Sequence, residues 1–231
     1  MVNDNPGGKN NSDDSKTIRL GLKPNINQFL ILVLVNAFVG AMVGLEQTVV
    51  PLIGKDTFHI ESNTLILSFI ASFGTTVNEI GFLKALHPGI WGVLQLLTGS
   101  LSDRIGRKIL IYPGMIVQAI GVWTVLFTHS SFGWITGMSL LGIGTALVYP
   151  TLLAAISDIA HPRWRATSLG VYRFWRDLGF VFGAVGIGFI ADISSTSIAI
   201  QFVAWIALAS GIFVLIVMRE IKRISSMTMN I

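Results

Sequence analysis

The sequence is 231 residues long, with 52% hydrophobic and only 12% charged residues. Soluble domains carry about 25% charged residues, and a chain of this length still exposes roughly 30% of its surface after folding. The composition therefore excludes an ordinary water-soluble domain and favours lipid as the solvent. The absence of cysteine excludes disulfide frameworks and thiol chemistry.

The chain begins with a polar tail and continues as a series of apolar runs. Residues 1–26 are rich in Asn, Gly, Asp, Ser and Lys, which predicts a disordered cytoplasmic tail. A helix needs about 20 residues to cross a bilayer core of ~30 Å. Spans of that size are predicted at residues 28–53, 80–102, 109–127, 134–156, 166–190 and 199–218. We expect an all-α membrane protein with a helical bundle over residues 27–219 and a cytoplasmic tail at 220–231.

The basic residues decide how the chain is threaded. Twelve of the 16 Lys and Arg residues lie in the N-terminal tail, in the turn 103–108, at 163–165 or after the last span. Positive charge stays on the cytoplasmic side, so the tail and the turn share that side, separated by an even number of crossings. The apolar stretch 64–74 is too short to span and is expected to re-enter, lie at the interface or extend the next helix. We therefore expect both termini to be cytoplasmic and the helical bundle to lie in the cell membrane. Short basic clusters between apolar runs give no reason to expect a nucleic-acid partner.

The most specific motif follows the second long span. It combines one acid with several fixed cations at a predicted helix–turn–helix junction, and arginine there can make bidentate contacts. Charge alone leaves two interpretations open, a gating latch that breaks when helices tilt or a plain positive-inside anchor. The residues concerned are Gly99, Asp103, Arg104, Gly106, Arg107 and Lys108.

This motif, G-x-L-x-D-R-x-G-R-K, resembles the cytoplasmic signature loop of the major facilitator superfamily, and every position is filled. In that family the loop follows the second helix and its copy follows the eighth. The resemblance implies a latch between two six-helix halves. Residues 38–46 resemble the first helix of the family, whereas 79–84, 141–150 and 164–179 resemble helices eight, ten and eleven. Helices three to seven would be missing, so the chain looks like a half-size or internally deleted member. Since the halves are pseudo-repeats, one six-helix repeat remains.

Charges inside the apolar runs are the candidate substrate or coupling-ion pathway: Glu46, Arg173, Arg176 and Asp177. A charge at the membrane centre costs ~2.5–3.5 kcal/mol on insertion scales, so such residues usually face a cavity or a partner. Arg173 and Asp177 stand at i, i+4 and can pair on one face. A structural ion pair in place of a pathway stays open, and Glu46 can equally be an outer-end residue that touches water. Asp158 is expected to be an interfacial anchor.

The predicted function is secondary transport of a small solute by alternating access. A lone repeat forms one wall of such a pathway, so a homodimer or a separate transporter half is the expected partner within the lipid bilayer. The alternative is a non-transporting remnant or an accessory subunit that binds another transporter. No catalytic motif or nucleotide-binding loop is present, so no enzyme activity and no cofactor are expected. The histidines lack the neighbours that a metal site requires.

Overall fold

A computed structural model of the chain describes residues 25–47 and 65–218, and all regular structure in them is helical. The elements follow in chain order: α1 (Ile26–Gln47), α3 (Leu65–Ala71), α4 (Val77–Ile105), α5 (Arg107–Phe127), α6 (Ser131–Ile159), the short 3-10 helix η2 (Pro162–Trp164), α7 (Arg165–Ile193) and α8 (Thr196–Val217). The predicted C-terminal tail, 220–231, lies outside the described residues, as does the predicted N-terminal tail, 1–26, except for its last two residues.

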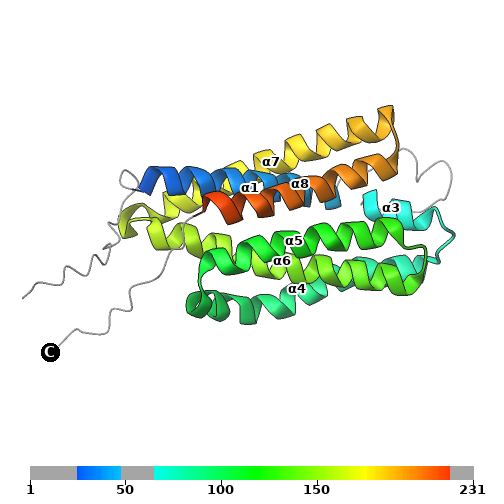
Figure 1. Ribbon diagram of the computed structural model, residues 1–231, viewed down its shortest axis with the longest axis horizontal. Coiled ribbons are helices and arrows are strands. Elements are labelled where there is room, and N and C mark those ends of the chain that lie inside the picture. The colour runs from blue at the N-terminus through cyan, green and yellow to red at the C-terminus, as the bar shows by residue number, and fades with distance from the viewer. Residues whose placement is uncertain (1–24, 48–64, 219–231) are drawn as a thin grey trace, which may run out of the picture.

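The six long helices run side by side as a bundle with two distinct ends (Figure 1). The start of α1, the α4–α5 turn, the α6–α7 connection and the end of α8 lie at one end. The α5–α6 and α7–α8 turns and α3 lie at the other. The beginning of α1 and the basic turn 103–108 therefore share an end, as the charge pattern predicts.

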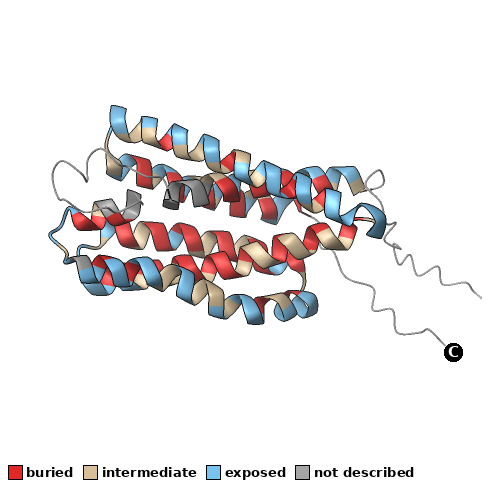
Figure 2. Ribbon diagram, turned by 180° about the vertical axis from the view of Figure 1, so that it is seen from behind, coloured by how far each residue is buried: buried red, intermediate tan, exposed pale blue. Residues whose placement is uncertain are grey.

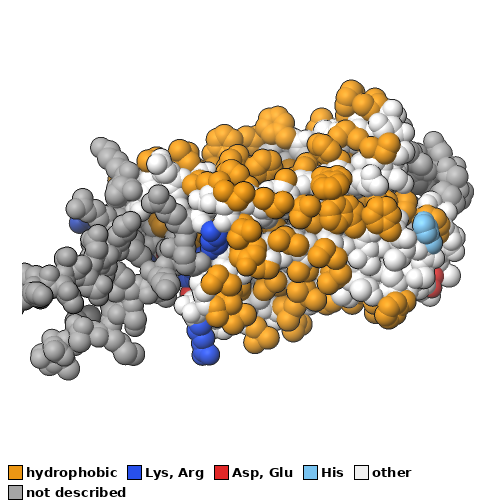
Figure 3. All heavy atoms as spheres, in the orientation of Figure 1, with side chains coloured by type: hydrophobic (Ala, Val, Ile, Leu, Met, Phe, Trp, Pro, Cys, Tyr) orange, Lys and Arg blue, Asp and Glu red, His pale blue; other side chains and the backbone are white. Residues whose placement is uncertain are grey.

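Length and composition support membrane crossing. The five helices from α4 to α8, with η2 leading into α7, are long and apolar enough to span a bilayer. The first helix, α1, has 22 residues, about 33 Å at 1.5 Å per residue, of which 26–41 form a shorter apolar segment. On the face drawn in Figure 3, apolar side chains cover the middle of the bundle and blue Lys and Arg side chains lie near one end. The prediction of an all-α bundle of about six helices is confirmed.

The short apolar stretch before α4 is a separate helix. Its seven residues, α3, are too few to cross a bilayer, and α3 ends in a turn with Gly74 at φ +78°. A capping box then starts α4 at Val77, in which the Thr76 side chain accepts from the Glu79 amide and Glu79 accepts from the Thr76 amide. This cap explains why α4 begins three residues before the predicted span.

The core lies along α5 and α6, whereas α4 and α7 are the most exposed of the long helices (Figure 2). Two apolar clusters fill the bundle. One, at the α3 end, includes Leu67, Trp134 and Ile200; the other, at the opposite end, includes Leu32, Ile156 and Val214. Because few apolar side chains of α4 and α7 are buried, these two helices expose wide apolar faces to the surroundings.

Glycines set the closest helix approaches. A Cβ on Gly40 of α1 would overlap the backbone of Arg176, and one on Gly179 of α7 would overlap the backbone of Ala37. A Cβ on Gly183 would lie 2.5 Å from the Ala41 carbonyl oxygen. Small residues at these positions therefore let α1 and α7 pack closely against each other.

Candidate gating and transport site

The chain reverses its direction between α4 and α5 at a single residue. Gly106 is the only residue between the two helices, and its φ of +107° and ψ of 154° form a conformation that side-chain-bearing residues rarely adopt. Its amide still donates to the Ser102 carbonyl oxygen at 3.2 Å. Because the turn is so tight, the last turn of α4 and the first turn of α5 lie next to each other.

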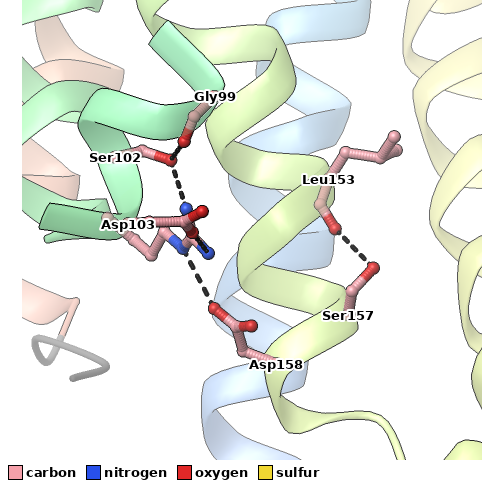
Figure 4. A network of polar contacts seen from close by, with 7 residues as sticks. Gly99, Ser102, Asp103, Leu153, Ser157 and Asp158 are labelled. Atoms are coloured by element: carbon pink, nitrogen blue, oxygen red, sulfur yellow. Dashed lines mark hydrogen bonds and ion pairs between the residues drawn. The ribbon is translucent and has the colours of Figure 1, made fainter. Parts of the chain in front are cut away.

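Arg107, the first residue of α5, is the centre of an ion-pair network, and its partners Ser102, Asp103 and Asp158 are labelled in Figure 4. Its side chain is only 4% exposed. It donates through Nη2 to Asp103 Oδ1 at 2.5 Å, through Nε to Asp158 Oδ2 at 3.0 Å, and through Nη1 to the Ser102 hydroxyl. The Ser102 hydroxyl itself donates to the Gly99 carbonyl oxygen at 2.8 Å. One guanidinium therefore joins α4, α5 and α6.

The predicted latch residues thus fall into two groups. Gly99, Asp103 and Arg107 belong to the network, with Gly106 making the turn that allows it. Arg104 is exposed and Lys108 is half-buried, which leaves these two cations at the surface of the same end. Asp158, which the sequence predicts to be an interfacial anchor, is also a direct ion-pair partner of Arg107.

The charges of α7 pair differently from the predicted i, i+4 arrangement. Asp177 Oδ1 accepts from its neighbour Arg176, with Nη2 at 2.7 Å and Nε at 2.8 Å. The Arg176 guanidinium also lies over the Tyr149 ring of α6, 5.4 Å from its centroid. Arg173 is exposed. The suggested Arg173–Asp177 pairing is therefore replaced by an Arg176–Asp177 pair directed toward α6.

Glu46 lies in the last turn of α1, and its side chain is outside the described part of the structure. Its proposed place in the pathway stays a prediction. Among the residues that the structure does describe, no group of three or more His, Asp or Glu side chains is arranged to hold a metal ion.

Sequence reasoning missed a polar cluster inside the bundle. His87 Nε2 of α4 lies 3.2 Å from the Thr145 hydroxyl of α6, and Gln118 Nε2 of α5 donates to the same hydroxyl at 2.8 Å. Trp91, one turn after His87, stacks on its ring at a centroid distance of 6.4 Å and packs edge-on against Tyr149 at 5.6 Å. The available signal was a glutamine and a histidine within or beside apolar runs.

These contacts form a continuous line on the molecule. It runs from His87 through Trp91 and Tyr149 to Arg176 and Asp177, and so connects α4, α6 and α7. Polar and aromatic groups in such a line can hold a solute by stacking, hydrogen bonding and charge.

The fold and the charged turn define a multi-spanning helical membrane protein with a fixed basic end. The family model described as Major Facilitator Superfamily matches residues 32–226, so the chain belongs to this family of membrane transporters. It is accordingly an integral, multi-pass membrane protein.

Curated relatives of the chain share about a quarter of its residues over the matched segments. An uncharacterized MFS-type transporter of Methanocaldococcus jannaschii is 24% identical over 159 residues, covering 67% of this chain and 41% of the relative. The multidrug resistance protein MdtH of Aeromonas hydrophila is 26% identical, covering 55% and 32%. The quinolone resistance protein NorA of Staphylococcus aureus is 23% identical, covering 54% and 32%.

Among solved structures, the human organic anion transporter MFSD10 matches with a TM-score of 0.54 and 19% identity, over 84% of this chain and 47% of that chain. This likeness shows the fold. The chain spans less than half the length of the relatives that it matches.

Proposed function

We propose that this chain is one half of a secondary transporter for a small organic solute, which works by alternating access with a second six-helix half. The second half is a further copy of this chain or a separate protein. The observation that carries the proposal is the line from His87 to Asp177, which lies across α4, α6 and α7 and offers one wall of a pathway. The names of the relatives MdtH and NorA favour organic solutes as the substrate class.

The network around Arg107 supports a gating role for the basic end. Arg107, Asp103 and Asp158 are used within the repeat, whereas Arg104 and Lys108 stay available for a second half. We infer that Arg107, Asp103 and Asp158 keep α4, α5 and α6 together as these helices tilt. Arg104 and Lys108 then contact the second half. The basic end lies in the cytoplasm and the bundle in the cell membrane, because Lys and Arg gather at the ends of spans on the inner side.

A flux assay in liposomes tests transport directly. The full chain, purified in mild detergent and reconstituted, is given an imposed pH gradient and a fluorescent quinolone as the probe. We expect gradient-dependent accumulation of the probe, together with light scattering for twice the 25.1 kDa chain mass. A strict monomer without flux would exclude a further copy of this chain as the second half, and would leave a separate half or the alternative, a non-transporting remnant or accessory subunit.

Replacing Asp177 with asparagine is expected to lower quinolone flux at least about tenfold without lowering stability. Asp177 positions Arg176 over Tyr149, and its side chain is 65% exposed, so replacement by asparagine, which has nearly the same shape, removes the charge without disturbing the packed core. Asp192→Asn, at an exposed site near the end of the same helix, is the matched control and should transport normally. Equal flux in the wild type and the Asp177 variant would remove this pair from the pathway.

A further inference from the structure

In the part of the chain that the structure describes, four charged side chains lie away from the helix ends. Three are cations, Lys84 of α4 and Arg173 and Arg176 of α7, and one is an acid, Asp177. Arg173 and Asp177 come eight and twelve residues after the start of α7, about 12 and 18 Å along the helix. A charge at membrane depth is costly unless it faces a cavity or a partner. The middle of α4 and α7 therefore carries an excess of positive charge.

The single acid in this set is already paired. Asp177 Oδ1 accepts from both Nη2 and Nε of Arg176, so the pair carries no net charge. Arg173 is exposed, and its side chain makes no ion pair with an acid of the described residues. Arg173 and Arg176 stand at i, i+3 and are neighbours on the helix surface. A guanidinium keeps its charge at any ordinary pH, so Arg173 is available to bind an anion.

Aromatic rings continue the surface next to Arg176. The Arg176 guanidinium lies 5.4 Å from the centroid of the Tyr149 ring, and Trp91 of α4 packs edge-on against the same ring at 5.6 Å. Both aromatic residues are half-buried, so part of each side chain stays accessible. Aromatic side chains hold other planar rings by offset stacking or edge-to-face contact. A planar aromatic group next to an anionic group therefore fits this surface.

Trp91 also has a hydrogen-bond donor in reserve. Its Nε1 atom is buried and has no hydrogen-bond partner among the described residues. Buried polar atoms are nearly always paired, so this donor indicates that Trp91 meets an acceptor at another stage of the transport cycle. An indole N–H and a guanidinium can donate hydrogen bonds but cannot accept them. Trp91 and Arg173 therefore suit a ligand that carries acceptor oxygens, and not an ammonium ion.

We propose that this chain recognises organic anions with a planar aromatic body, with the anionic group bound by Arg173 and the body held by Trp91 and Tyr149. The inference rests on the proposed transport function and narrows its substrate class. A carboxylate or sulfonate matches the guanidinium fork with two parallel hydrogen bonds. A quinolone, which carries a carboxylate on a fused aromatic ring system, belongs to this class.

Three probes with the same ring system and different charge test the recognition. Naphthoate, naphthylmethylammonium and naphthalenemethanol are measured by equilibrium dialysis against the full chain in phosphatidylcholine nanodiscs, with empty nanodiscs as the blank. We expect naphthoate to bind at least about tenfold more tightly than the other two, the effect of a charge-assisted hydrogen bond. Arg173→Gln should remove this preference, and Arg173→Lys should keep part of it. Arg163→Gln, an exposed site in η2, makes the same change in net charge and should keep all of it.

The outcomes separate the two proposals. Equal or tighter binding of the ammonium probe, equal losses in the variants at 163 and 173, or no naphthoate binding by the folded wild type overturns anion recognition at Arg173. In liposomes, Arg173→Gln should lower quinolone flux at least about fivefold relative to Arg163→Gln. Quinolone flux that is equal in these two variants overturns the inference, while transport stands. If the wild type moves no quinolone but binds naphthoate through Arg173, the proposed transport fails and anion recognition stands.

Discussion

Replacing Arg107 with methionine is expected to lower the free energy of unfolding by about 3 kcal/mol. Breaking a buried ion pair by removing one partner costs roughly 3–5 kcal/mol, and the lower end applies because the Asp103 side chain is 46% exposed. The loss leaves Asp158, only 14% exposed, without its cation. Unfolding in mixed detergent micelles, followed by circular dichroism, measures the change.

Arg104→Met is the matched control for this variant. Arg104 is exposed in the last turn of α4, three residues before Arg107, so the same loss of charge should change stability by less than about 0.5 kcal/mol. Equal effects of the two variants would mean that the network at Arg107 does not hold α4, α5 and α6 together.

Replacing Gly179 with valine is expected to separate α1 from α7 and to destabilise the bundle by about 3 kcal/mol, the upper part of the range for overpacking. The new Cβ would overlap the Ala37 backbone, and a backbone cannot change rotamer to make room. The same micelle unfolding assay measures the loss.

Gly186→Val on the same helix provides the comparison, since a Cβ there has no neighbour within 4 Å. Its effect should stay below about 1 kcal/mol, the cost or gain of replacing a helical glycine. If the variants at 179 and 186 were equally stable, close packing of α1 on α7 would not be what holds α7 in place.

The sequence predicts six long helices, and their ends within the described residues agree with the structure to within three residues. The predicted end of the first span, at residue 53, lies outside the described residues. Apolar runs of about 20 residues and the side preference of Lys and Arg are local signals. These signals predict that the stretch 64–74 does not cross the membrane by itself. The structure has the seven-residue helix α3 there, which is too short to cross. The early start of α4 was missed because a polar cap, Thr76 with Glu79, begins the helix before its apolar run.

The partners of the site residues were harder to predict, because they depend on how each helix is rotated. Arg107 and Asp158 are 51 residues apart in sequence, and nothing local pairs them. Arg173 and Asp177 had suitable spacing, but Gly179 and Gly183 turn α7 toward α1, and Arg176 reaches Tyr149 instead. Likewise, only the packing of α4 on α6 brings His87 to Thr145.

The membrane threading on which the function depends is tested most directly by labelling single cysteines. The chain has none of its own, so Ser12→Cys, Lys108→Cys, Ser130→Cys and Ser194→Cys each supply one reactive thiol. In intact cells an impermeant maleimide should label positions 130 and 194, and should reach 12 and 108 only after the membrane is opened. Labelling of 12 and 108 from opposite sides would contradict the six-helix repeat and the transport pathway built on it.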